Sequence, residues 1–167
     1  MTDLIWTFQK PKESKIAMDM KELEQRITRL EDIEAIKQLK VRYSHICDDL
    51  HNPDTIASVF AEDAIWESAD FGRAQGHDDI RALFQKFRDM FTFSQHNMTN
   101  PIIEVNGDRA TGIWYISGPW THTENNHAIW MAARYDDDYV KIDGEWKYQH
   151  LRASVRMLAE RQVISET

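Results

Sequence analysis

The side chains of this 167-residue chain that could transfer protons at neutral pH are its seven histidines and the carboxylates near them. Histidine suits the work of a base because its unperturbed pKa lies close to neutrality. Taken alone, however, His96 in a strand-like segment is most simply a structural histidine. Asp48 also has a local explanation, namely solvation of a helix end or a hydrogen bond with His45 or His51. Any chemistry therefore depends on the elements that bring such side chains together.

The residue pattern does not favour metal chemistry. His122 and His127 flank a turn without a third ligand nearby. Hard cations usually take their ligands from a shaped loop, so we expect the acidic run at 136–138 to be a solvated strand edge or a bulge. Cys47 is the single cysteine, which excludes an internal disulfide and a multi-thiolate site, and we expect it to be buried and inert. The sequence predicts no metal site and no cofactor.

The overall charge argues against nucleic acid as a partner. The 28 acidic residues outnumber the 20 basic ones, which gives a formal net charge of -8, and the basic residues are scattered. No apolar run approaches the roughly 20 residues that a membrane span needs. The N-terminus lacks a basic stretch followed by an apolar core, and the single cysteine fits a reducing compartment. We expect a cytoplasmic protein that binds neither membrane nor nucleic acid.

The first part of the chain is helical after a polar beginning. Residues 1–18 form a proline-containing N-terminal extension and 161–167 a C-terminal tail, which leaves one domain at 19–160. From Met20 onward, apolar residues recur at three- and four-residue steps up to a helix-stopping cluster at 48–53. This pattern predicts one long helix, or a short helix running into a second. Its cap is Asp19 or Asp32.

Short helices and strands follow. We expect helices at 54–60 and 77–90, a strand at 63–68 and a turn region at 71–76. Four long strand-like stretches joined by turn-forming sequences lie at 94–105, 109–120, 128–139 and 146–158. This order predicts an α+β fold in which a cone-shaped, curved antiparallel sheet wraps around the N-terminal helices. The open mouth of such a cone is a natural ligand site.

Three stretches carry a family resemblance that covers about residues 20–158. The first contains 33–39 and leads to Tyr43 and Asp48, the second is 60–66, and the third begins at His96 and includes 100–112. In this order and spacing they resemble the SnoaL-like branch of the nuclear transport factor 2-like superfamily. The resemblance implies a cystatin-like α+β barrel. It is strongest to cofactor-free eliminating enzymes of that branch, namely bile acid 7α-dehydratase, scytalone dehydratase and hexachlorocyclohexane dehydrochlorinase.

The resemblance implies roles for particular residues. Those enzymes pair an Asp at the end of the first helix with a His at the start of a central strand, and Asp48 and His96 stand at the matching positions. Tyr43 matches a Tyr that the dehydratases carry five residues before the Asp. The bile acid enzyme also uses an Arg near the end of its last strand, and here Arg156 matches better than Arg152.

The chain departs from the bile acid enzyme on the stretch 114–120. That enzyme has an acidic residue there, whereas this chain has Gly118 and a proline, so substrate contacts are expected to differ. Asn100, four residues after His96, is expected on the same side of a strand, against ligand or backbone. The expected walls of the cone are aromatic and comprise Trp66, Phe84, Trp114, Trp120 and Trp130.

Together these residues supply the parts of an elimination next to a carbonyl group. His96 would act as base and then as acid, Asp48 would orient it, and Tyr43 and Arg156 would contact the substrate oxygen. We therefore predict a cofactor-independent lyase, a dehydratase acting on a cyclic or polycyclic carbonyl-bearing small molecule. The alternatives are an isomerase or cyclase using the same proton abstraction, or a non-catalytic small-molecule-binding module. A homo-oligomer is expected because one sheet face needs cover, and the resemblance favours a trimer over a dimer.

Overall fold

The computed structural model describes residues 19–124 and 126–160, so the expected extension and tail lie outside the described residues. The helices in these ranges are α1 (Met20–Asp48), α2 (Pro53–Ile56) and α3 (Gly76–Met90), with a 3-10 turn, η1 (Ala57–Val59). None of them is long and apolar enough to cross a membrane. The strands are β1 (Phe60–Ser68), β2 (Gly72–Gln75), β3 (Phe91–Ser94), β4 (Asn97–Asn106), β5 (Arg109–His122), β6 (Ala128–Ile142) and β7 (Glu145–Glu160).

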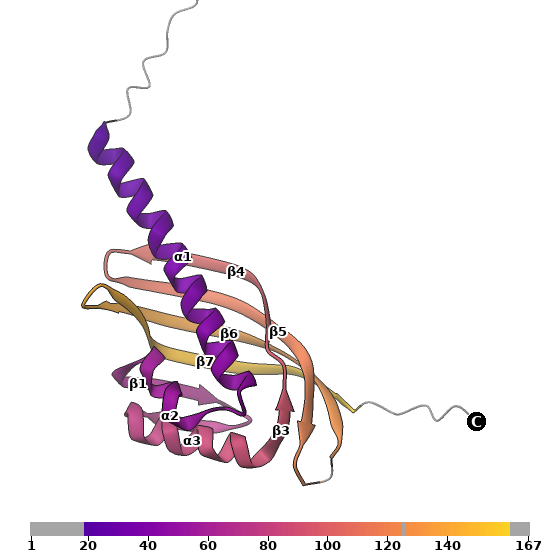
Figure 1. Ribbon diagram of the computed structural model, residues 1–167. Coiled ribbons are helices and arrows are strands. Elements are labelled where there is room, and N and C mark those ends of the chain that lie inside the picture. The colour runs from indigo at the N-terminus through magenta and orange to yellow at the C-terminus, as the bar shows by residue number, and fades with distance from the viewer. Residues whose placement is uncertain (1–18, 125, 161–167) are drawn as a thin grey trace, which may run out of the picture.

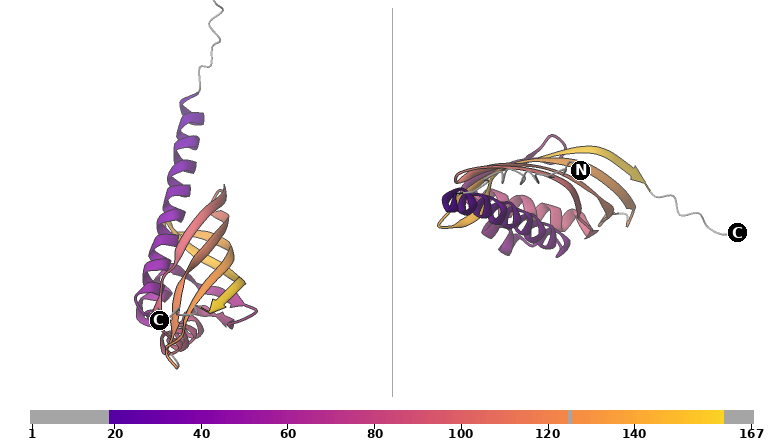
Figure 2. Two further views of the ribbon diagram at one scale, coloured as in Figure 1. Left: turned by 90° about the vertical axis from the view of Figure 1, so that its right-hand side faces the viewer. Right: turned by 90° about the horizontal axis from the view of Figure 1, so that it is seen from above.

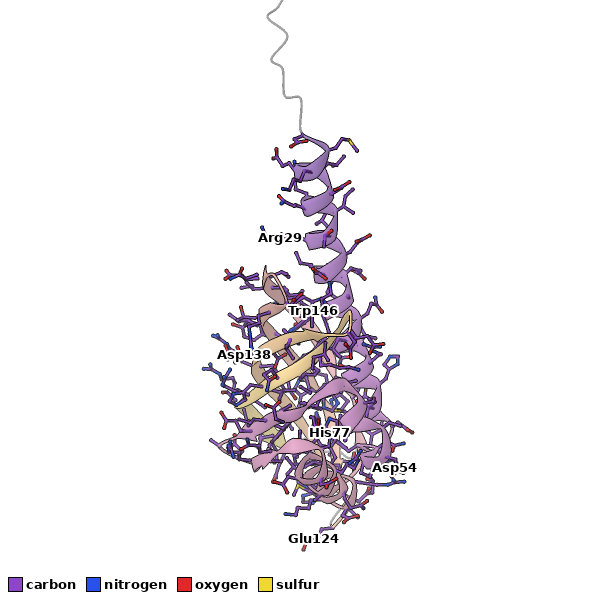
Figure 3. The ribbon with its side chains drawn as sticks, turned by 90° about the vertical axis from the view of Figure 1, so that its left-hand side faces the viewer. Arg29, Asp54, His77, Glu124, Asp138 and Trp146 are labelled. Carbon is purple, nitrogen blue, oxygen red and sulfur yellow. The ribbon has the colours of Figure 1, made fainter. Side chains whose placement is uncertain are left out.

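Of the two expected arrangements, α1 is the single helix, with 29 residues, and it begins after Asp19, one of the two expected caps. The side chain of Asp19 accepts a hydrogen bond from the backbone N–H of Lys21. The first turns project beyond the sheet, as Figures 1 and 2 show, and Figure 3 places Arg29 on this projecting part. From Asp32 onward the helix crosses the sheet. Asp32 does not cap a helix, because its Oδ1 accepts hydrogen bonds from Lys141 Nζ (2.7 Å) and Trp146 Nε1 (2.9 Å).

The sheet has seven strands in the order β2-β1-β7-β6-β5-β3, and β4 also pairs with β5. It arches over the helices, which all lie on its concave side (Figure 2). This confirms the expected α+β architecture, although the sheet is mixed, since β1 runs parallel to β7 while the other pairs are antiparallel. The expected turn region at 71–76 contains a strand, β2, and the expected stretch 94–105 is two strands separated by Gln95 and His96.

A buried ion pair joins the middle of α1 to the sheet. Lys40 Nζ lies 2.8 Å from Asp137 Oδ2, and both side chains are almost fully shielded from solvent. Tyr139 donates a second hydrogen bond to the same carboxylate oxygen (2.8 Å). The acidic run at 136–138 is therefore not a solvated edge as a whole, because strand alternation turns Asp137 toward the core. Burial lowers the pKa of Lys40 and raises the pKa of Asp137, and their mutual attraction opposes both shifts.

A close backbone approach fixes the connection between β3 and β4. Gln95 N–H donates to the carbonyl of Pro119 on β5 at 3.1 Å. A Cβ atom added to Gly118 would lie 1.9 Å from the carbonyl oxygen of Gln95. Glycine is thus required at this position because any side chain would displace the backbone next to His96.

Replacing Lys40 with Met should lower the free energy of unfolding by about 3–5 kcal/mol, because the Asp137 carboxylate would stay buried without its cation. The double variant Lys40→Met/Asp137→Asn should recover most of this loss, since neither side chain is then charged. Urea unfolding of the two variants and the unchanged chain measures the difference. Arg81→Met, which breaks the exposed pair with Asp78, is the control and should change stability by less than about 1 kcal/mol. An equal loss in the single and double variants would contradict the ion-pair explanation.

Gly118→Ala should destabilise the protein by about 1–3 kcal/mol, because the new methyl group collides with backbone that cannot rotate away. The neighbouring change Ser117→Ala serves as control and should leave stability nearly unchanged. Thermal and urea unfolding measure both. The prediction fails if the two alanine variants are equally stable.

Candidate active site

The side chains of His96 and Asp48 meet where the β3–β4 connection passes the end of α1. His96 Nδ1 lies 2.7 Å from Asp48 Oδ1. The backbone N–H of His96 also donates to both oxygens of this carboxylate, at 3.0 and 3.2 Å. The imidazole is enclosed, with 2% of its side chain exposed, whereas 31% of the Asp48 side chain is exposed. Asp48 and His96, which the family resemblance pairs and which are 48 positions apart in the sequence, thus lie in contact.

Local structure at the end of α1 positions Asp48. The helix α1 ends at Asp48, and the chain reverses through Leu50 and His51, which both have left-handed backbone angles (φ 52° and 51°). The hydroxyl of Ser94 on β3 donates to the carbonyl of Cys47 at 3.1 Å. A carboxylate at a helix C-terminus gains nothing from the helix dipole. The hydrogen bonds from His96 compensate for this unfavourable placement.

The contact with Asp48 determines which nitrogen of His96 can take up a proton. A carboxylate accepts hydrogen bonds, so Nδ1 carries the hydrogen and Nε2 holds the free lone pair. Burial lowers the pKa of His96, and the hydrogen bond and charge of Asp48 partly oppose this effect. The imidazole is therefore neutral at neutral pH, which is the form that can act as a base.

His96 forms part of the wall of a mostly apolar cavity between the helices and the concave face of the sheet. The cavity has a volume of about 30 Å³, so the side chains of its wall nearly fill it. Its wall is largely aromatic and includes Trp66, Phe71, Phe84, Phe87, Phe91 and Trp120. Of the expected aromatic walls, Trp66, Phe84 and Trp120 do line it. The apolar wall suits a compact organic ligand with few polar groups, and the entry of such a ligand requires the wall side chains to move apart.

Tyr43 supplies a hydroxyl in the same cavity. Its oxygen accepts a hydrogen bond from Trp66 Nε1 at 3.1 Å, and its ring lies edge-on to His96 with 6.5 Å between ring centroids. Burial raises the pKa of Tyr43 well above its ordinary value, so the phenol stays protonated. Trp66 uses a lone pair of this oxygen, so the hydroxyl can still donate its hydrogen, and the side chains of Cys47 and Tyr135 lie within its hydrogen-bonding reach.

Two further polar residues line the cavity although the sequence analysis gave them no role in the site. Cys47 and His51 stand four positions apart, one in the last turn of α1 and one in the reversal that follows. His51 was one of two local partners expected for Asp48, but the carboxylate bonds to His96 instead. The four-residue spacing of Cys47 and His51 at the helix end was the only sequence signal for them. It indicates a shared site only once the structure places His96 beside both.

Arg156 and Arg152 are not brought into the cavity. Arg156 is exposed at a bulge, where Met157 and Val155 pair with adjacent residues of β6 and Arg156 is left unpaired. Arg152 lies on the other face of β7 from the cavity-lining Ala153, and its guanidinium donates to Asp138 at 2.7 Å.

Three other expected contacts also lie elsewhere. Asn100 is exposed at a bulge in β4 with a left-handed φ of 51°, and His96 precedes that strand, so strand alternation does not relate the two. Trp114 is buried outside the cavity, where its Nε1 donates to the hydroxyl of Tyr139 at 2.9 Å. Trp130 is 46% exposed, because alternation along β6 turns it away from the concave face.

Comparisons with known proteins agree with this fold. The family model of the SnoaL-like domain matches residues 28–152. The gamma-hexachlorocyclohexane dehydrochlorinase of Sphingobium indicum is 29% identical to the chain over 110 residues, which are 65% of this chain and 70% of that protein.

Solved structures give the same result. A type 2 hexachlorocyclohexane dehydrochlorinase superimposes with a TM-score of 0.78 at 25% identity, over 85% of this chain and 97% of that one. A protein of Novosphingobium aromaticivorans, predicted to be a scytalone dehydratase, superimposes with a TM-score of 0.74 at 23% identity, over 85% and 99% of the two chains, and shows the fold alone. The chain belongs to the SnoaL-like domain family of the nuclear transport factor 2-like superfamily.

Proposed function

We propose that the protein is a cofactor-independent lyase that removes water from a cyclic, carbonyl-bearing small molecule. The observation that carries this proposal is the 2.7 Å contact between His96 Nδ1 and Asp48 at the wall of an apolar cavity. A buried, oriented and neutral imidazole is a base that needs no metal to remove a proton beside a carbonyl group. Asp48 fixes its orientation and stabilises the imidazolium that forms.

The reaction divides into two proton transfers. His96 Nε2 takes a proton from the carbon next to the carbonyl group, and the electron pair of that C–H bond moves toward the carbonyl oxygen. The hydroxyl of Tyr43 donates a hydrogen bond to this oxygen as negative charge develops, a type of contact that is strongest in an apolar site. The electrons then return to form the C=C bond, the C–O bond of the leaving hydroxyl breaks, and the imidazolium returns its proton to make water.

A second candidate differs only in the leaving group. The S. indicum relative is a dehydrochlorinase, and the wall of the cavity here is mostly apolar. Chloride departs without being protonated, so His96 would act only as base and would lose its proton to solvent afterwards. Elimination of hydrogen chloride from a halogenated ring therefore requires the same His96–Asp48 pair but not the donor hydroxyl of Tyr43.

Conservative changes in the pair test both candidates. His96→Gln and Asp48→Asn should each lower kcat/KM by about 10²–10⁴, because general acid–base catalysis contributes this much. The assay is mass spectrometry on a panel of cyclic hydroxyketones and chlorinated rings, in which the product is lighter by one water or one hydrogen chloride. Asp49→Asn is the matched control, because the carboxylate of this neighbour accepts a hydrogen bond from Asn52 and does not contact His96 in the described part of the chain, so the change should not affect turnover.

Each other outcome of this assay has a defined meaning. A product of unchanged mass indicates an isomerase or cyclase. Ligand binding without any product indicates a binding module. Turnover that survives both His96→Gln and Asp48→Asn rejects the pair as the catalytic group.

The pH dependence of kcat/KM should follow the protonation of His96. Burial lowers the pKa of this group, so the active neutral form persists below the ordinary histidine value of about 6.5, and activity is lost as pH falls through the lowered pKa. Asp48 raises that pKa, so Asp48→Asn should move the acidic limb of the profile to still lower pH. NMR titration of the His96 ring gives the same pKa without substrate. An acidic limb above 6.5, or a shift toward higher pH in Asp48→Asn, would contradict the assignment.

A further inference from the structure

Three side chains with metal-binding atoms converge in the cavity. Cys47 comes from the end of α1, His51 from the reversal after it, and His96 from the β3–β4 connection, and all three are buried. One ligand atom of each lies within 4.8 Å of the others. Sulfur and imidazole ligands around a tetrahedral zinc ion lie about 3.5 Å apart, so the three groups need to close by little more than about 1 Å.

His51 provides an independent indication of a missing partner. Its residue is 3% exposed, and its Nδ1 is buried without a hydrogen-bond partner among the described residues. The ring packs against those of Phe87, Phe91 and Trp120, but aromatic carbon does not satisfy a ring nitrogen. The left-handed backbone at Leu50 and His51 is costly for residues with a side chain. An unpaired polar group held in the cavity by such a backbone points to a ligand.

We propose that Cys47, His51 and His96 form a binding site for one borderline-soft divalent cation, with Zn²⁺ as the ion that the ligand set fits best. A thiolate with two imidazoles is a ligand set of tetrahedral zinc, and three protein ligands leave one position for water or a cavity ligand. Asp48, bonded to Nδ1 of His96, holds the second nitrogen of a metal-bound histidine in the way that outer carboxylates do.

The charges of the site balance. Zn²⁺ together with the Cys47 thiolate and the Asp48 carboxylate has no net charge, and the nearby Lys40 is already neutralised by Asp137. This balance matters because an isolated charge is costly in a cavity of low polarity. Burial lowers the pKa of His96 and lowers that of His51 to about 3, so neither ring must lose a proton to bind the ion.

The thiol of Cys47 does have to lose its proton. Its pKa is raised by burial, an effect that Asp48 adds to and that Tyr43 and Lys40 oppose. Binding therefore breaks the S–H bond, forms the S–Zn bond and releases one proton to the buffer. The other titratable groups in the cavity wall are Tyr43, Tyr135, His51 and His96, and none of them supplies a proton near neutral pH. Affinity should accordingly rise about tenfold per pH unit.

The metal and the proposed elimination compete for one atom. A cation bound to Nε2 of His96 occupies the lone pair that would take the substrate proton, so Zn²⁺ should inhibit turnover. The site itself does not depend on the proposed function, because ion binding is measured without substrate. A chain that binds the ion but has no lyase activity would leave the metal site intact. A chain that has lyase activity but binds no ion would reject the metal site and leave the proposed function intact.

Titration of the untagged full-length chain with Co²⁺ tests the site. We expect one ion per chain, with a thiolate-to-cobalt absorption band and the visible bands of a tetrahedral ion, and Zn²⁺ should bleach both. Cys47→Ser and Cys47→Ala should lose the thiolate band, and His51→Gln should weaken binding. Asp48→Asn should weaken Zn²⁺ binding by about 10–100-fold. The control His122→Gln/His127→Gln, which removes two histidines outside the cavity wall, should bind as the unchanged chain does.

Three results would overturn the proposal. These are absence of Co²⁺ binding at neutral and at raised pH, binding without a thiolate band, and binding that survives the Cys47 changes but is lost in the His122/His127 control. Circular dichroism and thermal unfolding of each variant establish that it is folded. Two replacements are used at Cys47 because a methyl group avoids burying a hydroxyl without a partner, so Cys47→Ala keeps the test valid if Cys47→Ser unfolds.

Discussion

Polar contacts at eight-residue intervals attach α1 to the concave side of the sheet, and the rest of the molecule depends on them. Asp32 binds Lys141 and Trp146, Lys40 binds Asp137, and Asp48 binds His96. Eight helical residues rise about 12 Å, so the contacts are spread along the crossing. Apolar packing alone would let a helix slide or rotate on a smooth surface, whereas hydrogen bonds of defined length fix both its depth and its rotation. The last of these contacts also orients His96, the residue to which we assign the proton transfers.

The cavity exists because the polar contacts of α1 lie on either side of an aromatic layer. Tyr43 stands between Lys40 and Asp48 on the helix, and it faces Trp66 and the ring of Tyr135. On one side of this layer the ion pair of Lys40 closes the core, and on the other side His96, His51 and Cys47 meet unfilled space. The same helix therefore supplies Lys40 for a sealed ion pair and, about two turns later, Asp48 for the contact with His96.

The sequence predicts where the helices and strands lie better than it predicts which face of the sheet each side chain occupies. The period of α1 and the long strands follow from local residue chemistry, Asp19 was one of two expected caps, and the family pattern brought Asp48 and His96 together. The face that a strand residue occupies depends on the register of its strand, and a bulge shifts that register for the residues that follow. The bulge that leaves Arg156 unpaired makes alternation unreliable near the end of β7.

Long-range partners were also invisible from the sequence. Asp137 has acidic neighbours on both sides and differs from them only because Lys40, 97 residues away, lies beneath it. The parallel pairing of β1 with β7 joins strands that are far apart in sequence, so no turn sequence between them predicts it. His51 became notable only when the structure showed that its Nδ1 lacks a partner.

Gly118 restricts how the segment that carries His96 can change. The Gln95 carbonyl occupies the space that a side chain at position 118 would need, and Gln95 is bonded through its N–H to Pro119. A chain with a side chain at position 118 must therefore route its β3–β4 connection differently. The two arrangements are alternatives, so an acid cannot be grafted onto position 118 without rebuilding the segment that holds His96. A lineage passing from one to the other has to change strand and connection together.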